Sequence, residues 1–121
     1  MLVTIKNTKH ELFFGFDFLE YINKEYGPEM PELGVKVPAG GINFLNMAYS
    51  LNDPVALAKT LIGATISSAN KISKGQAEEF VFSLIEDGKF EDFYNEVKEE
   101  VKKDRILKAF MTLEEKKVKA K

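Results

Sequence analysis

The sequence predicts a mainly α-helical α+β fold in which an N-terminal β-hairpin packs on a bundle of about five helices. Two observations carry this prediction. Residues 2–14 alternate apolar and polar side chains, as half-buried strands do. From residue 17 onward, apolar residues recur at helical spacing, several of these segments begin at capping residues, and two end at Gly27 and Gly88. Because the chain has 121 residues, we expect a single domain covering residues 1–121.

The hairpin is expected over residues 2–14, with LVTIK (2–6) and HELFF (10–14) as strands and NTK between them as the turn. The side chains expected on its buried face are Val3, Ile5, Leu12 and Phe14. Two strands alone are marginally stable in water, so this face must pack against helices.

Helices are expected at about residues 17–26, 41–51, 53–69, 73–87 and 89–118. The segment 53–69 carries the strongest signal, because Asp53 is a good N-cap and Pro54 occupies the first helical position. Its apolar and small residues cover nearly every face, which predicts a buried central helix. Ser73 and Gln76 form a capping box for the next helix, and Gly88 is expected to end it.

The apolar stripe of the last helix slips out of register after Val101. Either the helix bends near Asp104 or a new helix starts there. The polar end, EEKKVKAK, is expected to fray.

The segment FFGFDFLEYINKEYG (13–27) crowds four phenylalanines into six positions. We expect Asp17 to cap the first helix, and Phe16 and Phe18 to seat that helix against the hairpin. Core packing is the favoured interpretation of this cluster, and a ligand pocket is the alternative.

Composition argues against catalysis and against a cofactor. The chain has no cysteine and a single histidine, which excludes disulfides, thiolate metal sites, a cysteine nucleophile and a multi-histidine metal site. His10 is expected to be exposed or bonded locally, and adjacent acidic pairs diverge in direction on a helix. We therefore expect no enzyme, no metal and no small-molecule substrate.

The N-terminus does not resemble a signal peptide, and no apolar stretch is long enough to cross a bilayer. The expectation is a cytosolic domain with no membrane partner. Net charge is −2, which argues against general nucleic-acid binding. Residues 98–121 are nonetheless rich in lysine, so a small helical nucleic-acid-binding or regulatory protein is the alternative function, although Arg105 is the only arginine.

Three segments carry a family resemblance: LVTIKNTKHELFFGFDFLEYINKEYG, NDPVALAKTLIGAT and FEDFYNEVKEEVKK. Over residues 2–103 the chain resembles the tail assembly chaperones of long-tailed, siphovirus-type bacteriophages of Gram-positive hosts. The resemblance implies a non-catalytic protein that binds and solubilises the tape measure protein and helps to recruit tail tube subunits. It also implies residence in the host bacterial cytoplasm, absence from the finished virion, and in many phages a longer frameshifted product.

A chaperone for a long helical client needs an exposed apolar surface. One candidate is the out-of-register stripe after Asp104, and the other is the Gly/Pro-rich segment 27–41, which is either a partner-binding loop or a disordered connector. The candidate partner-binding residues are Met30, Leu33, Leu107, Phe110, Met111 and Leu113. Self-association into a homo-oligomer is the alternative use of these residues.

Overall fold

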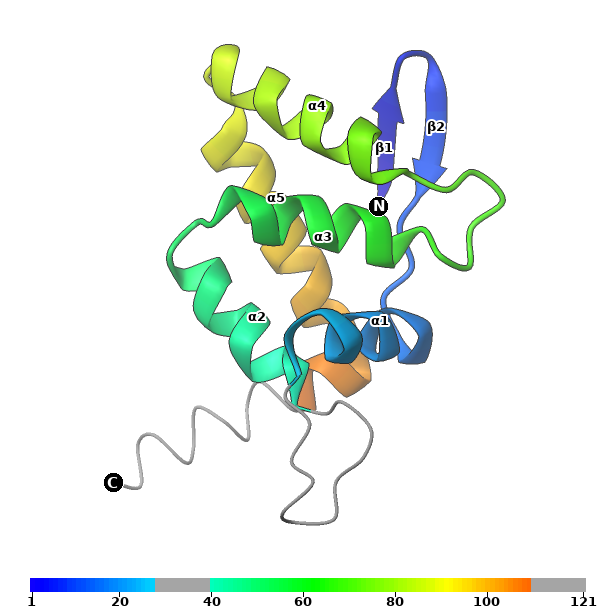
Figure 1. The fold of residues 1–121 in the computed structure, drawn as a ribbon, viewed down its shortest axis with the longest axis vertical. Helices are drawn as coiled ribbons and strands as arrows, with labels where there is room; N and C mark the ends of the chain where they lie inside the picture. The colour runs from blue at the N-terminus through cyan, green and yellow to red at the C-terminus, as the bar shows by residue number, and fades with distance from the viewer. Residues whose placement is uncertain (28–39, 110–121) are drawn as a thin grey trace.

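The structure is a computed structural model that describes residues 1–27 and 40–109. Its labelled elements are β1 (Leu2–Ile5), β2 (Thr8–Glu11), α1 (Phe16–Tyr26), α2 (Gly41–Ser50), α3 (Pro54–Ala64), α4 (Lys74–Glu86) and α5 (Phe90–Lys103). A short unlabelled helix follows at residues 105–109. Figure 1 shows the hairpin beside the start of α4, with α3, α2 and α1 below them. The predicted α+β fold with an N-terminal hairpin on a helical bundle is confirmed.

The hairpin is tighter than the sequence suggested. β1 and β2 are antiparallel with Ile5 opposite Thr8, so the turn consists of Lys6 and Asn7 alone instead of residues 7–9. Both turn residues have positive φ, 48° and 68°, as a type I′ turn requires. The second strand consequently ends at Glu11, three residues earlier than expected.

The first helix begins at Phe16, with Gly15 at the N-cap. Asp17 lies inside the first turn and makes no side-chain cap hydrogen bond, so its predicted capping role was wrong. Phe18 is fully buried, whereas Phe16 is 74% exposed. Residues two apart on a helix point in nearly opposite directions, so these two phenylalanines cannot both face the core.

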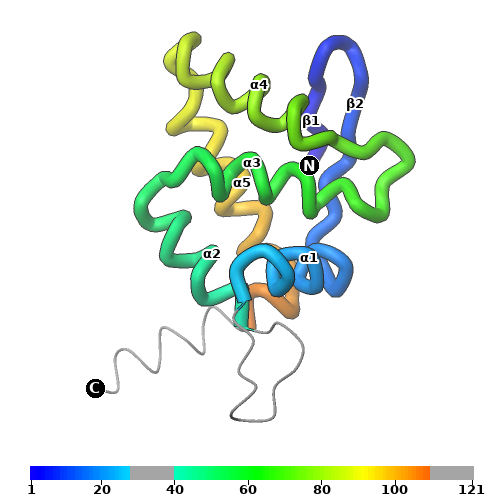
Figure 2. Tube along the Cα trace, in the orientation of Figure 1, coloured from blue at the N-terminus to red at the C-terminus, as the bar shows by residue number. Residues whose placement is uncertain are grey.

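α3 runs through the middle of the fold, with α4 on one side and α1 and α2 on the other (Figure 2). Seven of its residues are buried, as expected for a central helix: Ala56, Leu57, Ala58, Thr60, Leu61, Gly63 and Ala64. The helix ends at Ala64, five residues before the predicted end. The backbone amide of Phe13 donates to the Ala64 carbonyl at 2.8 Å, and Thr65 Oγ1 accepts from the Ile72 amide at 2.9 Å. These bonds tie the loop after α3 to the hairpin exit and to the start of α4.

α1 and α2 approach each other very closely at Gly41. The Gly41 amide donates to Asn23 Oδ1 at 2.8 Å. A Cβ atom at position 41 would overlap the backbone carbonyl of Ile22. Only glycine therefore fits at the first position of α2.

α5 does not continue to residue 118. Asp104 is in an extended conformation, and its Oδ1 accepts from the amides of Ile106 at 3.0 Å and Leu107 at 3.1 Å. Asp104 thus ends one helix and caps the next, which explains why the apolar stripe changes register. Of the two alternatives for residues 89–118, a bend near Asp104 or a new helix starting there, the structure has the new helix, and residues 110–118 lie outside the described part of the chain.

Candidate protein-binding surface

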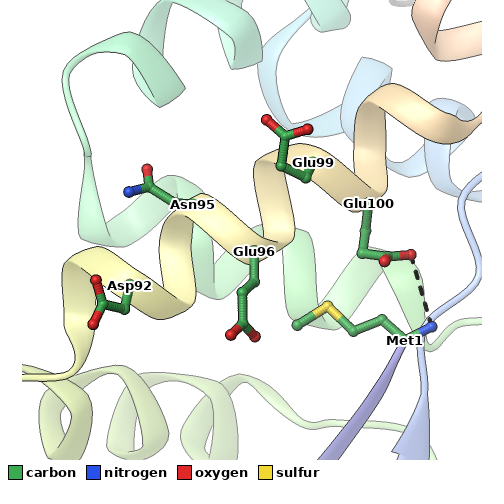
Figure 3. Close-up of a pocket in the computed structure, with 6 residues that line it drawn as sticks. All are labelled: Met1, Asp92, Asn95, Glu96, Glu99 and Glu100. Atoms are coloured by element: carbon green, nitrogen blue, oxygen red, sulfur yellow. Dashed lines mark ion pairs between the residues drawn. The ribbon is translucent and has the colours of Figure 1, made fainter.

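The polar surface of α5 forms an open concavity of about 590 Å³. It is lined by Met1, Asp92, Asn95, Glu96, Glu99 and Glu100. Figure 3 shows Glu99 and Glu100 pointing apart, with the N-terminal ammonium of Met1 4.0 Å from Glu100. The hydrogen bond from Lys103 lowers the pKa of Glu100, so this carboxylate stays ionised near neutral pH. The side chains do not converge on a common point, as a substrate or metal would require.

Within residues 1–27 and 40–109, no group of three or more His, Cys, Asp or Glu residues is placed to hold a metal ion. His10 is 2% exposed, and its Nδ1 lies 2.8 Å from the Asn70 carbonyl oxygen. The Asn70 side-chain amide donates in return to the Lys9 carbonyl at 3.1 Å. His10 therefore joins the hairpin to the loop after α3, sixty residues away, instead of bonding locally as one reading of the sequence suggested.

α2 carries an exposed apolar stripe. The helix contains no charged residue, and Leu45 and Tyr49 on one face are buried. Phe44 and Met47 on another face are 47% and 63% exposed, and Leu51 just beyond the helix is 75% exposed. These three residues lie at i, i+3 and i+7, so they follow one line along the helix. We call Phe44, Met47 and Leu51 the α2 stripe.

A second apolar feature lies between the start of α3 and the last half of α4. It is an open groove of about 210 Å³ lined by Pro54, Val55, Ala58, Glu78, Val81, Phe82 and Ile85. Val55, Phe82 and Ile85 are 57%, 60% and 49% exposed, so their side chains are presented to solvent. We call this feature the α3/α4 groove.

The two features are close in sequence at the corner between α2 and α3. Leu51, the last residue of the α2 stripe, precedes Pro54 of the groove by three residues. Figure 1 shows the end of α2, the start of α3 and the end of α4 on the same side of the molecule. We refer to the α2 stripe and the α3/α4 groove together as the apolar surface.

Polar and aromatic contacts hold this corner in place. The hydroxyl of Tyr94 on α5 donates to the Asp53 carbonyl at 2.8 Å. The rings of Tyr49 and Tyr94 pack edge to face with their centroids 5.7 Å apart. The hydroxyl oxygens of Tyr49 and Thr60 are hydrogen-bonded at 2.6 Å. The corner is therefore fixed to three helices, so the apolar surface is presented on a rigid support.

The residues that the sequence suggested for partner binding occupy other places. Leu107 is 0% exposed and packs in the core, so the structure does not present it to a partner. The other five, Met30, Leu33, Phe110, Met111 and Leu113, lie outside the described residues.

The apolar surface was missed, although part of its signal is in the sequence. Phe82 lies two residues after Phe80 and two before Leu84, so it falls off the apolar stripe of its own helix. The segment 42–52 is apolar on most sides, which is more than one buried face needs. Both features indicate that these two helices carry more apolar residues than the core can bury.

Fold and surface together define a small, mainly helical protein with several exposed apolar side chains. Clustered exposed apolar side chains are typical of protein interaction sites. In the described residues, no helix is long and apolar enough to cross a membrane.

Comparison with known families agrees with this class. The family model described as "Phage tail assembly chaperone protein, TAC" matches residues 2–114. The chain therefore belongs to the phage tail assembly chaperone family, and it acts with phage tail proteins in a non-enzymatic role. No curated protein and no solved structure matches the chain.

Proposed function

We propose that this chaperone binds the tape measure protein, keeps its apolar helical segments from aggregating, and helps to recruit tail tube subunits. Family membership supplies the setting, which is the assembly of a phage tail. The apolar surface is the observation that carries the proposal, because it offers six exposed apolar side chains from three helices to one partner.

An apolar helical client suits this surface. A long helix in water needs its apolar face covered, and a groove between two helices covers such a face efficiently. Met47 adds an adaptable side chain that repacks against different sequences. One chaperone surface of this type serves successive segments of a long client.

The proposal extends to location and assembly state. The chain works in the cytoplasm of the bacterium that a siphovirus-type phage infects. It dissociates from the tail before the virion is finished. Before the client arrives, copies of the chain cover their apolar surfaces in a homo-oligomer. Met30, Leu33, Phe110, Met111 and Leu113 are further candidate client contacts.

Co-expression with the tape measure protein tests the proposal. We expect the wild-type chain to raise the soluble fraction of the tape measure protein several-fold over an empty vector. Phe82→Ser should abolish most of this gain, because it removes the exposed ring from the α3/α4 groove. Phe16→Ser is the matched control, since Phe16 is also highly exposed but lies on α1, away from the groove. Equal insolubility of the tape measure protein with and without the wild-type chain would contradict the proposal.

A further inference from the structure

We propose that the occupant of the α3/α4 groove is an amphipathic helix whose apolar stripe is flanked by lysine or arginine. This inference rests on the proposed function for the identity of the client, and it deepens that function by naming the chemistry of the client segment. The groove supplies the apolar contact, and the acidic end of α4 supplies the selection for basic flanks.

The charged residues at the two ends of α4 are placed unfavourably relative to the helix dipole. Its first residue is Lys74, at the positive end, and no acidic residue lies in its first turn. Its last residue is Glu86 and its C-cap is Asp87, at the negative end, with no basic residue in the last turn. Carboxylates at a helix C-terminus are unfavourable. The end of α4 therefore bears negative charge that its own helix does not compensate.

α1 and α5 carry their terminal charges in the opposite order. α1 has Asp17 in its first turn and Lys24 in its last. α5 has two acidic residues in its first turn and two lysines in its last. α2 and α3 have no acidic residue in the first turn and no basic residue in the last. Among the labelled helices, α4 is therefore the one with reversed terminal charges, and a basic partner would compensate them.

The acidic side chains around the groove are available to a partner. Glu78 lines the groove and is exposed, as are Glu86 and Asp87. In the described part of the chain, none of these three takes part in an ion pair. Lys89 is the nearest cation in sequence, at the start of α5, and it is likewise free of ion pairs there. Glu78 lies in the groove, and Glu86 and Asp87 directly follow the groove residue Ile85. We call these three carboxylates, which outnumber the single Lys89, the acidic rim.

The charge of the polar residues beside the apolar surface changes from the α2 stripe to the α3/α4 groove. The polar neighbours of the α2 stripe are Asn43, Asn46 and Ser50, which are uncharged. The groove end is acidic. Asn52, directly after Leu51, accepts a hydrogen bond from Lys98 Nζ at 2.6 Å, so a cation is also present at this end. A helix lying across both features therefore meets neutral and cationic groups at one end and carboxylates at the other, so its basic flank belongs at the α4 end.

Binding of designed peptides to the full chain tests the inference by fluorescence anisotropy. The first peptide is a helix of about 18 residues, roughly 27 Å long, with leucine at i, i+3, i+4 and i+7 and flanking lysines. The second replaces the lysines with glutamates. The third keeps the composition of the first but scrambles the leucine stripe, which controls for general attraction of a cationic peptide.

The lysine-flanked peptide should bind about threefold to tenfold more tightly than the glutamate-flanked peptide, and at least tenfold more tightly than the scrambled one. Phe82→Ser should weaken its binding about tenfold, whereas Phe16→Ser should leave it unchanged. The preference for lysine should decrease in higher salt, because exposed charges are screened.

Two charge variants separate the groove from the rest of the acidic surface. Glu86→Gln with Asp87→Asn should remove most of the preference for lysine flanks. Glu96→Gln with Glu99→Gln removes the same charge from the α5 concavity of Figure 3, and should leave the preference intact. Circular dichroism confirms that each variant is folded.

The outcomes are decisive in both directions. Equal binding of the lysine-flanked and glutamate-flanked peptides would overturn the inference. So would an equal loss of the preference for lysine flanks in both charge variants. If Phe82→Ser dissociates a dimer and no peptide binds, the groove is covered by a second copy and the inference fails. Failure of the peptide experiment while the wild-type chain still solubilises the tape measure protein would leave the proposed function standing with a different client surface.

Discussion

The hydrogen bond between Tyr49 and Thr60 gives a sharp prediction about the corner that supports the apolar surface. Tyr49 is 3% exposed and Thr60 is 0% exposed, and their hydroxyl oxygens are 2.6 Å apart. The Thr60 hydroxyl also lies 2.8 Å from the Ala56 carbonyl, to which it donates its only hydrogen. The Tyr49 hydroxyl must therefore donate to Thr60. Burial raises the pKa of Tyr49, so this donor stays protonated.

The direction of the bond makes the two single variants unequal. Thr60→Val leaves a buried Tyr49 hydroxyl without an acceptor, and this should lower the free energy of unfolding by about 1–3 kcal/mol. Tyr49→Phe removes the donor, but the Thr60 hydroxyl keeps its bond to Ala56. Its cost should be about 0.5–1.5 kcal/mol. The double variant leaves no orphaned hydroxyl, so it should cost clearly less than the sum of the two.

Urea unfolding followed by circular dichroism measures these free energies, with unchanged m-values as the check on two-state behaviour. We expect Thr60→Val to be the less stable single variant and the double variant to recover about 1 kcal/mol relative to additivity. Strictly additive costs, or Tyr49→Phe costing more than Thr60→Val, would refute the reasoning.

Three further predictions concern other contacts of the described fold. Gly41→Ala should destabilise the protein by at least about 2 kcal/mol, since its Cβ overlaps the Ile22 carbonyl, and thermal unfolding measures this loss. Ser73→Ala should cost about 1 kcal/mol in urea unfolding, because it removes the acceptor for the Gln76 amide in the α4 capping box; a cost below about 0.3 kcal/mol would contradict that role. The hydrogen bond from Lys59 lowers the pKa of Glu25, so Glu25→Gln should reduce stability at pH 7 by less than about 1 kcal/mol. The stability difference between the wild-type chain and Glu25→Gln should decrease as the pH falls below about 4.3, the pKa of a glutamate in the unfolded chain. It should vanish below the lower pKa that Glu25 has in the folded chain. A stability difference that stays constant down to pH 2 would argue against the pairing.

Local signals in the sequence predicted much of the fold. The Asp53 cap with Pro54 at the first helical position, and the capping box at Ser73, depend on neighbours within four residues and were confirmed. The break at Asp104 has the same local origin, because the Asp104 side chain caps the next turn. The register slip indicated this break, although it did not distinguish a bend from a new helix.

Features that depend on tertiary contacts were harder to predict. The burial of His10 requires the Asn70 carbonyl from a loop sixty residues away, which no local pattern indicates. The α3/α4 groove requires the start of one helix to lie beside the end of another, so Val55 and Ile85 resembled core residues in sequence. The exposure of Phe82 was deducible from helical spacing alone, and that signal was overlooked.

Hydrogen–deuterium exchange on the complex with the tape measure protein tests the central claim most directly. The account predicts that binding slows exchange in residues 44–55 and 78–87, which contain the apolar surface and its acidic rim, and leaves residues 13–18 unchanged. Slower exchange confined to the Phe13–Phe18 segment or to the polar face of α5, with none over the α3/α4 groove, would contradict it.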